Sequence, residues 1–459
     1  MPDTPTSPAP DLPTTYADVE RALLARWPET KLEPSLDRIE SLVHTLGDPQ
    51  HSYPVVHLTG TNGKTSTSRM IDTLLRARGL RTGRFTSPHV ESMTERISLD
   101  GDPISEEGFV SAYHDVAPFA ALVDAEGEHP LSFFETVVGM AYAAFADAPV
   151  DAAIVEVGMG GSWDATNVVD ANVAVITPIS VDHAKYLGER PEDIALEKAG
   201  IIKPGSTVVV AEQPPAVMEV LLERAAEVGA AAVLREGVDF GVVRRVPAVG
   251  GQLLRIQGLR AEYDEVFLPL YGAHQGQNAA LALAAVEAFA GDEPLDAELV
   301  HEAFAQVTSP GRLEIIRRSP TIVLDAAHNP HGAKAVAEAL EDSFTFTPLI
   351  GVVGVMADKD YEGVLAAFEH VFAEIVCTQN STPRAMPAEE VAEIARGIYG
   401  TDRVHVAPRL DDAIDKAATL AETGGVYGSG GVLVTGSVIT VGEARSMLKP
   451  RDRGGKASR

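Results

Sequence analysis

The sequence predicts an α/β protein of two domains, a larger N-terminal domain with a parallel sheet and a smaller α/β domain behind it. Three observations favour this fold class. Short apolar runs rich in Val and Ile recur along the chain, helical patterns follow most of them, and the runs are apolar throughout instead of alternating. Strands buried on both faces are typical of parallel sheets covered by helices, whereas strands with one exposed face alternate apolar and polar residues.

The expected elements follow this pattern along the whole chain. Strands are predicted at residues 55–58, 153–157, 173–177, 207–210, 322–324, 350–355, 375–378 and 432–435. Helices are predicted at residues 67–78, 216–228, 334–340, 364–371 and 411–421. The stretch from about 238 to 270 differs, because apolar and polar residues alternate there between glycines, and this predicts antiparallel hairpins inserted in the α/β body.

A cluster of turn-forming residues from Thr308 to Gly311 predicts the boundary between the two domains. The first domain is expected over residues 15–308 and the second, a Rossmann-like α/β domain, over residues 309–448. Residues 1–14 and 449–459 are rich in Pro, Gly or charge and lack an apolar period, so we expect disordered tails there.

The composition excludes several classes of partner. The chain has 459 residues, and 37 Lys and Arg against 66 Asp and Glu give a formal net charge of −29. Nucleic acids and anionic membranes are polyanions, so neither is expected as a partner. No apolar run reaches the about 18 residues that cross a bilayer, and the first residues lack the apolar segment of a secretory signal, which predicts a cytoplasmic protein. The single cysteine, Cys377, excludes a Cys-rich metal site and a disulfide framework.

The segment VVHLTGTNGKTSTSRMIDTLL predicts a strand, a glycine-rich loop and a helix. Glycines let backbone N–H groups close around phosphate oxygens, and the helix N-terminus adds partial positive charge. Lys64 can bridge the terminal phosphates, while Thr65 or Ser66 can offer a hydroxyl to Mg²⁺. The glycines are closer together than in the pattern G-x-x-x-x-G-K-[ST], but the strand–loop–helix context favours a P-loop ATPase-type domain over a glycine turn with a surface lysine.

Polar residues also follow other predicted strands of the first domain. Glu156 ends an apolar strand, where a buried carboxylate needs a metal ion or a cation unless it turns to solvent. Asp182 and His183 follow another strand, and His183 is as consistent with a structural as with a functional role, because hard Mg²⁺ prefers oxygen ligands. Lys198 lies in the helical segment EDIALEKAG, where an ordinary solvated lysine is the alternative.

Three segments of the second half carry further candidates. Residues 274–278, HQGQN, open a helix with amide groups that suit either a base edge or a helix cap. Arg312 lies in the expected linker, where its guanidinium can clamp phosphate across a cleft or be exposed. Asp325 and His328 follow a strand end, the edge at which α/β sheets bind ligands, although Asp325 can equally cap the next helix.

Together these motifs form a recognisable set: GTNGK at 60–64, TSPH at 86–89 with ERI at 95–97, SFFE at 132–135, Glu156 with GG at 160–161 and DATN at 164–167, DH at 182–183, EKAG at 197–200, DAAHN at 325–329, and GS at 436–437 with TVGE at 440–443. In this combination the chain resembles the folylpolyglutamate synthase/dihydrofolate synthase family, ATP-dependent ligases related to the Mur ligases. The resemblance extends from about Tyr16 to Arg445.

The resemblance implies an ATP site on both sides of the interdomain cleft, formed by Thr61, Asn62, Gly63, Lys64, Thr65, Asn278, Arg312, Asp325 and His328. It implies magnesium, two ions in all, with the ligands Ser87, Glu156 and His183. Lys198 matches a lysine that the family carries as a carbamate, N6-carboxylysine, which turns an ammonium into a carboxylate-like oxygen ligand. By this likeness the expected catalytic residues are Lys64, His183 and Lys198.

The resemblance also implies a pterin site, formed by Glu33, Pro34, Ser35, Ser132, Phe133, Phe134, Glu135, Trp163, Asp164 and Ala165. The chain departs from the family pattern at two places. Thr65 stands where glycine usually follows the P-loop lysine, and Ser162-Trp163 stand where Arg-Leu is common, so an arginine is lost and an aromatic ring gained. These departures bear on substrate contacts more than on ATP chemistry.

The implied activity is an ATP-dependent amide ligase that adds L-glutamate to reduced folates through an acyl phosphate, with dihydropteroate open as a further acceptor. The expected partners are these small molecules alone, and the expected protein is a monomer. A Mur-type peptidoglycan ligase is the nearest alternative, but the TSPH and SFFE motifs favour the folate branch. A non-catalytic P-loop nucleotide-binding protein would leave Glu156, His183 and Lys198 without a shared purpose.

Overall fold

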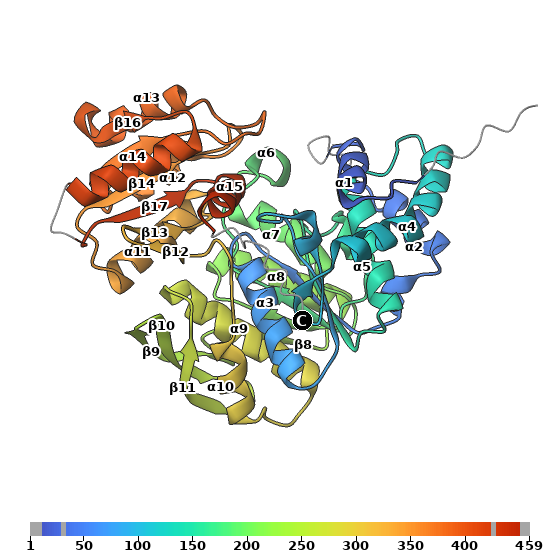
Figure 1. Ribbon diagram of the computed structural model, residues 1–459. Coiled ribbons are helices and arrows are strands. Elements are labelled where there is room, and N and C mark those ends of the chain that lie inside the picture. The colour runs from blue at the N-terminus through green and yellow to red at the C-terminus, as the bar shows by residue number, and fades with distance from the viewer. Residues whose placement is uncertain (1–11, 29–33, 424–427, 450–459) are drawn as a thin grey trace, which may run out of the picture.

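The computed structural model describes residues 12–28, 34–423 and 428–449 (Figure 1). These residues form a sheet of eight strands, a sheet of three and a sheet of six, with helices on the two larger sheets. This arrangement confirms the predicted α/β class. Glu33 and most of both expected tails lie outside the described residues. None of the helices within the described ranges is long and apolar enough to cross a membrane.

The eight-stranded sheet carries the P-loop. Its strands are, in spatial order, β4 (Asp102–Pro103), β3 (Ile97–Leu99), β2 (Thr82–Phe85), β5 (Ala152–Glu156), β1 (Val55–Thr59), β6 (Val173–Ile176), β7 (Thr207–Val210) and β8 (Ala232–Arg235). Strands β2, β5, β1, β6, β7 and β8 are parallel to one another. At one edge β3 pairs antiparallel with β2, and β4 pairs antiparallel with β3. The parallel core follows from the continuous apolar runs, and all four strands predicted in this domain are present.

Successive strand residues point to opposite faces, so the large sheet carries a separate core on each side. Val56 and Leu58 pack with three helices, α3 (Lys64–Ala77), α9 (Ala273–Ala290) and α10 (Ala297–Ala305). Val55 packs toward four others, α1 (Tyr16–Leu24), α2 (Asp37–Thr45), α4 (Glu106–Glu126) and α5 (Phe133–Asp147). Next to them, β6 and β7 share a cluster with α6 (Ala184–Leu187), α7 (Pro191–Lys198) and α8 (Pro215–Val228).

The predicted hairpins form a small antiparallel sheet of β9 (Gly241–Ala248), β10 (Gly251–Gln257) and β11 (Glu262–Leu268). Burial alternates along β10 and β11, as expected for strands with one face on the core. Leu254 and Val266 pack in the same cluster as α9. The small sheet therefore supports the helix that opens with residues 274–278.

The six-stranded sheet forms the second domain, the orange and red part of Figure 1. Its order is β12 (Glu314–Arg318), β13 (Thr321–Leu324), β17 (Gly431–Thr435), β14 (Leu349–Val353), β15 (Glu374–Cys377) and β16 (Val404–Val406). Only β12 runs antiparallel to its neighbour. One face packs on α11 (Pro330–Ser343), α12 (Tyr361–Ala367) and α13 (Ala388–Tyr399), and the other on α14 (Leu410–Thr423) and α15 (Val438–Leu448). Cys377 is buried in β15, as expected of a structural thiol.

Candidate active site

The loop between β1 and α3 has the geometry of a phosphate loop. Gly60 and Gly63 have φ of 146° and 91°, a region that disfavours side chains. A Cβ atom on Gly60 would lie 1.9 Å from Thr177 Oγ1, and one on Gly63 would lie 2.6 Å from Asn278 Oδ1. Only glycine fits at either position, so the loop and the start of α9 approach each other closely.

Two lysines converge on the same carbonyl of this loop. Lys64 Nζ donates to the oxygen of Gly60 at 3.0 Å, and Lys198 Nζ donates to it at 2.8 Å. Lys198 is only 4% exposed, which excludes the surface-lysine alternative. Burial, with the charge of Lys64 beside it, lowers the pKa of Lys198 to about 7. Burial also lowers the pKa of Lys64, against the nearby charges of Glu156 and Asp182.

Glu156 faces the same loop because β5 lies beside β1, with Glu156 in register with Leu58. Its carboxylate is buried and accepts hydrogen bonds from the Thr65 hydroxyl at 2.9 and 3.1 Å. Burial raises its pKa, although Lys64 acts in the opposite direction. In the described part of the chain no ion pair reaches this carboxylate, so the solvent alternative is excluded and the need for a cation remains.

The nucleotide candidates of both domains line one cavity of about 590 Å³. They are Thr61, Asn62, Gly63, Lys64, Thr65, Asn278, Arg312, Asp325 and His328. Asn278 donates to Gln275 Oε1 at 3.2 Å, and no side chain caps α9, so the capping alternative is wrong there. Asp325 does not cap α11 either, because Asn329 does; Asp325 accepts from the N–H groups of residues 313 and 327. Burial raises the pKa of Asp325, opposed by the charge of Arg312.

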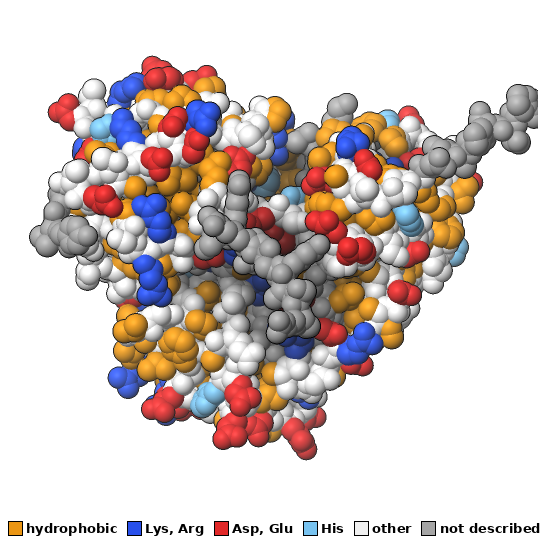
Figure 2. Space-filling view, viewed as in Figure 1, with side chains coloured by type: hydrophobic (Ala, Val, Ile, Leu, Met, Phe, Trp, Pro, Cys, Tyr) orange, Lys and Arg blue, Asp and Glu red, His pale blue; other side chains and the backbone are white. Residues whose placement is uncertain are grey.

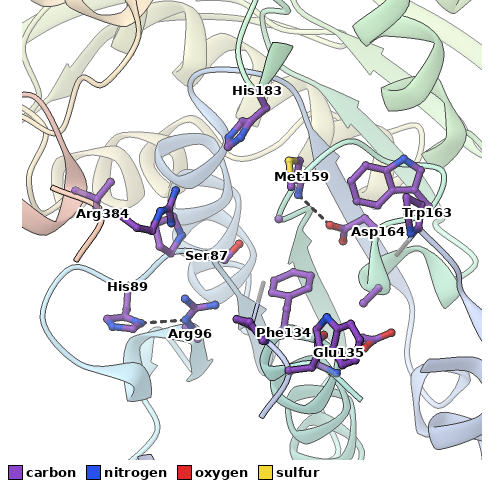
Figure 3. A pocket seen from close by; sticks show the side chains of 18 of the residues that line it. Ser87, His89, Arg96, Phe134, Glu135, Met159, Trp163, Asp164, His183 and Arg384 are labelled. Carbon is purple, nitrogen blue, oxygen red and sulfur yellow. Dashed lines mark hydrogen bonds between the residues drawn. The ribbon is translucent and has the colours of Figure 1, made fainter. Parts of the chain in front are cut away.

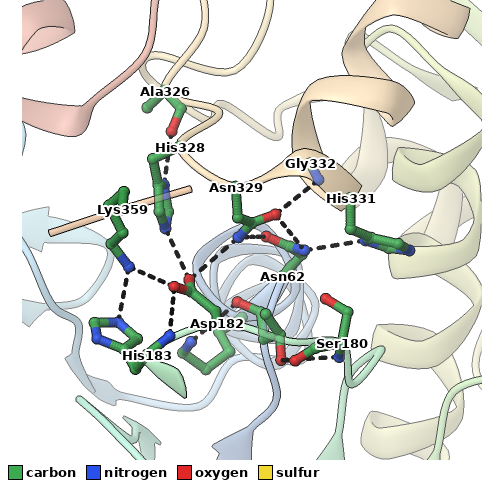
Figure 4. A network of polar contacts seen from close by, with 12 residues as sticks. Asn62, Ser180, Asp182, His183, Ala326, His328, Asn329, His331, Gly332 and Lys359 are labelled. Atoms are coloured by element: carbon green, nitrogen blue, oxygen red, sulfur yellow. Dashed lines mark hydrogen bonds and ion pairs between the residues drawn. The ribbon is translucent and has the colours of Figure 1, made fainter. Parts of the chain in front are cut away.

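A polar network joins the nucleotide loop to the second domain (Figure 4). Lys359 Nζ lies 2.6 Å from Asp182 Oδ1 and 3.1 Å from His183 Nε2. The other carboxylate oxygen of Asp182 accepts from Asn329 Nδ2 at 3.2 Å and lies 3.4 Å from His328 Nε2. Burial, together with the charge of Lys359, lowers the pKa of His183 to about 4, so this imidazole is neutral at neutral pH.

The same network reaches the P-loop directly. Asn62 and Asn329 exchange two amide hydrogen bonds, of 3.2 and 3.0 Å, and Asn62 Nδ2 lies 3.0 Å from His331 Nδ1. Asn329 is the N-cap of α11, which fixes it at the carboxyl edge of the second sheet. The loop that would hold a nucleotide is therefore in contact with both domains.

A second cavity of about 420 Å³ opens beside the first, and Figure 3 shows part of its wall. Of the predicted pterin residues it is lined by Pro34, Ser35, Ser132, Phe134, Glu135, Trp163, Asp164 and Ala165. Phe133 lies outside this lining; it is 7% exposed and packs in the core, with the guanidinium of Arg96 over its ring at 4.8 Å. We call this cavity the acceptor pocket.

Structural contacts hold the predicted pterin residues in place. Ser132 caps α5 in a capping box with Glu135, whose carboxylate also accepts from Arg38 Nε at 3.0 Å. Asp164 is buried and accepts from the N–H of Met159 at 2.9 Å. Each of these side chains therefore reaches the pocket from a fixed position.

Several residues that line the pocket were not predicted as site residues: Arg38, His89, Arg96, Met159, Met356, Lys359, Arg384 and Ser437. Four of them, His89, Arg96, Met159 and Ser437, stand inside or beside recognised motifs, and that proximity is a signal that could have found them. Arg38, Lys359 and Arg384 lie outside the recognised motifs, and tertiary structure brings them to the pocket, where they pair with Glu135, Asp182 and Asp358 respectively. The second domain thus contributes two cations, Lys359 and Arg384, to the wall of the pocket, although the face in Figure 2 carries many Asp and Glu side chains.

The two cavities meet. Ser87, Met159, His183 and His328 belong to the walls of both. Among the described residues no three His, Cys, Asp or Glu side chains are arranged to hold a metal ion. The donors of Ser87 and Glu156 are nevertheless oxygen atoms, as Mg²⁺ prefers, and the buried Glu156 lacks a cation. These residues fit Mg²⁺ at the junction of the cavities.

Comparison with known proteins identifies the class that this fold and site define. Residues 58–286 match the Mur ligase middle domain, and residues 311–438 match the Mur ligase glutamate ligase domain. The protein is thus a ligase built from the two domains that the Mur ligases share with their relatives.

The relatives narrow this class to one family. A dihydrofolate synthase/folylpolyglutamate synthase of Mycobacterium tuberculosis is 50% identical over 96% of this chain and 95% of that protein. One from Bacillus subtilis is 32% identical over 95% of this chain and 100% of its own length. The chain belongs to the dihydrofolate synthase/folylpolyglutamate synthase family.

Solved structures agree with this membership. Mycobacterium tuberculosis folylpolyglutamate synthase complexed with ADP is 50% identical, with a TM-score of 0.91 over 95% of this chain and 98% of that one. E. coli FolC in complex with DHPP and ADP is 29% identical, with a TM-score of 0.84 over 96% and 99% of the two chains. The matches favour the folate ligase interpretation over the peptidoglycan and non-catalytic alternatives.

Proposed function

We propose that the protein is an ATP-dependent ligase that activates a folate carboxylate as an acyl phosphate and joins it to the amino group of L-glutamate. The observation that carries this proposal is the junction of the two cavities. The nucleotide cavity, which the P-loop lines, and the acceptor pocket share Ser87 and His183, so a γ-phosphate and an acceptor carboxylate can meet there. Relatives complexed with ADP support ATP as the nucleotide.

Activation is necessary because the oxygen of a free carboxylate is a poor leaving group. In the proposed reaction one carboxylate oxygen attacks the γ-phosphorus, and ADP leaves. The glutamate amine then attacks the acyl carbon, loses a proton, and expels inorganic phosphate. Lys64 and the N–H groups at the start of α3 stabilise the charge on the moving phosphoryl group.

Mg²⁺ is part of this proposal. Glu156 and Ser87 would supply oxygen ligands and His183 a nitrogen, and the ion would act as a Lewis acid on the phosphoryl oxygens. To bind the ion, His183 Nε2 would have to give up its present contact with Lys359 Nζ. Lys359 keeps its second contact, with Asp182, so its ammonium remains at the junction.

We also propose that Lys198 is carbamylated. Carbon dioxide adds to a neutral amine, forming the N–C bond and releasing one proton. A lysine with a pKa of about 7 is largely neutral under conditions where an ordinary lysine is charged. The resulting anion would face Lys64, because both side chains reach the Gly60 carbonyl.

An acceptor assay tests the proposed function. Phosphate release from ATP is measured with and without L-glutamate, with dihydropteroate, tetrahydrofolate or a UDP-sugar peptide as acceptor. Glutamate-dependent release is expected with one or both pterin compounds, and this choice decides which of the two folate activities is present. Release with the UDP-sugar peptide alone, or nucleotide binding without glutamate-dependent release, would contradict the proposal. A monomeric, cytoplasmic enzyme stays a prediction from the sequence.

A further inference from the structure

Asn380 is a buried amide where three loops of the second domain meet. The loops follow β14, β15 and β17, whose carboxyl ends lie at the same edge of the parallel sheet. Each loop lines the acceptor pocket: the first with Met356 and Lys359, the second with Arg384 and the third with Ser437. Asn380 itself is 3% exposed and does not line the pocket.

The amide contacts all three loops. Its Nδ2 donates to Thr440 Oγ1 at 3.1 Å and to Ser437 Oγ at 3.4 Å, and lies 3.6 Å from Met356 Sδ. Its Oδ1 accepts from the backbone N–H of Thr382 at 3.1 Å and from its hydroxyl at 2.7 Å. Donor and acceptor are both satisfied, so the side chain has one defined orientation.

Two hydroxyl groups extend the hydrogen-bond network around Asn380. Ser437 donates to Thr440 Oγ1 at 2.8 Å, and Thr440 donates to the carbonyl of Gly354 at 2.9 Å. The loop that carries Arg384 is tied to the same place, because the Arg384 carbonyl accepts from the N–H of Ala357 at 3.0 Å. A shift of Asn380 therefore changes the spacing between Arg384 and Ser437.

This wall faces a different substrate from the rest of the site. Met356, Arg384 and Ser437 line the acceptor pocket but not the nucleotide cavity, and the predicted pterin residues all belong to the first domain. The substrate left to the second domain is the incoming amino acid. Its two carboxylates match the charges of Lys359 and of Arg384, which is labelled in Figure 3. These two side chains also pair with Asp182 and Asp358, at 2.6 Å each.

We infer that Asn380 is a positioning residue for the acidic amino-acid substrate, which it affects through Ser437 and Arg384 without touching it. The inference rests on the proposed function. A residue that merely stabilises the domain would alter the amount of folded enzyme and leave every KM unchanged. A positioning residue instead alters the KM of one substrate.

The test is steady-state kinetics of Asn380→Ala with ATP, folate and L-glutamate varied in turn. We expect the KM for glutamate to rise about tenfold, the effect of one displaced polar contact, with the KM for ATP and for folate within about twofold of wild type. The matched control is Tyr399→Phe, which removes a buried hydrogen bond of 2.7 Å to the Leu365 carbonyl in the same domain, away from the pocket. This control should leave all three KM values unchanged.

A second variant guards against misfolding of the first. Thr382→Val keeps Asn380 and the side-chain shape but removes the 2.7 Å hydrogen bond to Oδ1, and should raise the KM for glutamate about threefold. Wild-type values of this KM in the folded variants, or equal changes in all three KM values, overturn the inference. Absence of glutamate-dependent phosphate release in the wild type overturns the proposed function and the inference with it.

Discussion

Two lysines and one carbonyl define the site at the scale of single residues. Lys64 and Lys198 come from segments 134 positions apart and both donate to the oxygen of Gly60, in a loop where Cβ atoms do not fit. Burial lowers the pKa of both lysines, and at Lys198 the neighbouring charge of Lys64 lowers the pKa further. Such a pair is ready to receive negative charge, from a phosphate at Lys64 and from carbamylation at Lys198.

Lys64→Ala should abolish most ligase activity while the protein remains folded. Removing one preorganised cationic donor from a phosphoryl-transfer site costs roughly 10²- to 10³-fold in kcat. The measurement is glutamate-dependent phosphate release, together with the thermal unfolding midpoint. The control is Lys334→Ala on α11, whose side chain is 75% exposed and should be dispensable. Near wild-type turnover in the Lys64 variant would contradict its assigned role.

Carbamylation of Lys198 should depend on pH with a defined sign. Its folded-state pKa of about 7 lies below the ordinary value of 10.5, so the reactive neutral amine is present above pH 7 and lost as the pH falls through it. With ¹³C-labelled carbon dioxide held at a constant concentration, a carbamate NMR signal should therefore weaken below about pH 7. Lys198→Met should lack the signal at every pH.

The same variants connect this signal to activity. Lys198→Ala should lose most of its turnover and regain part of it with short carboxylic acids, which replace the missing oxygens. A signal that persists in Lys198→Met would place the carbamate elsewhere in the chain. Full activity of Lys198→Ala would show that the lysine is not needed.

Residue roles were predictable where a local motif constrains the backbone, and not where burial decides. The glycines at 60 and 63 and the lysine after them could be identified because strand, loop and helix are adjacent in sequence. The residues alone favoured a solvated Lys198, since nothing local to α7 says which of its faces will be covered. Lys359 and Arg384 had no signal at all, because their function arises only when the domains meet.

At the scale of elements, a side sheet supports the helix that borders the nucleotide cavity. Glu287 on α9 is fully buried and accepts hydrogen bonds from the N–H of Leu259 and, at 2.8 Å, from the Tyr263 hydroxyl. Leu259 lies in the turn between β10 and β11, and Tyr263 lies in β11 itself. One carboxylate thus fastens the three-stranded sheet to α9.

Glu287→Ala should lower the free energy of unfolding by roughly 2–3 kcal/mol, because the Leu259 N–H loses its acceptor and the Tyr263 hydroxyl keeps only the Leu295 carbonyl, at 3.4 Å. Urea denaturation measures this as a lower midpoint with an unchanged slope. The control, Glu223→Ala on the exposed side of α8, should shift the midpoint little. Equal midpoints in the two variants would mean that the fastening contributes nothing to stability.

Strands were predictable from the sequence when their residues form a continuous apolar run, and not when they carry charged residues. The central strands with long apolar runs were identified, and so were the hairpins, whereas the short or charged strands β3, β8, β12 and β16 were not predicted. Strand β2, TGRF, was missed because it carries Arg84, which is 1% exposed and is held by Asp72 and Ser98. Those partners lie on α3 and β3, so the compensation that allows an arginine inside a strand is tertiary.

At the scale of the whole molecule, the loop that carries Ser87 is held against the second domain. Glu91 of this loop contacts Arg445 of α15 and accepts from Lys449 Nζ at 2.6 Å. At Gly442 the helix touches the loop so closely that a Cβ atom would lie 1.9 Å from the Val90 carbonyl oxygen. The position of Ser87 therefore depends on how the two domains dock.

Gly442→Ala should separate α15 from the Ser87 loop. A displacement of about 1 Å at a reacting centre can cost roughly 10²-fold in rate, and we expect a loss of that order in ligase turnover. Gly397→Ala on α13 is the matched control, because no atom lies within 4 Å of the added methyl group. It should leave turnover unchanged and raise stability by about 0.5–1 kcal/mol. Equal turnover in the two variants would show that this contact does not control Ser87.

Lys359 makes chemistry depend on closure. Its ammonium comes from one half of the enzyme and completes the polar cluster of Asp182 and His183 on the other. If the two domains separated, the phosphate end of the cleft would lose that cation together with its shelter from water. The open enzyme would then exchange product for a new acceptor without catalysing phosphoryl transfer, so product release would not consume ATP.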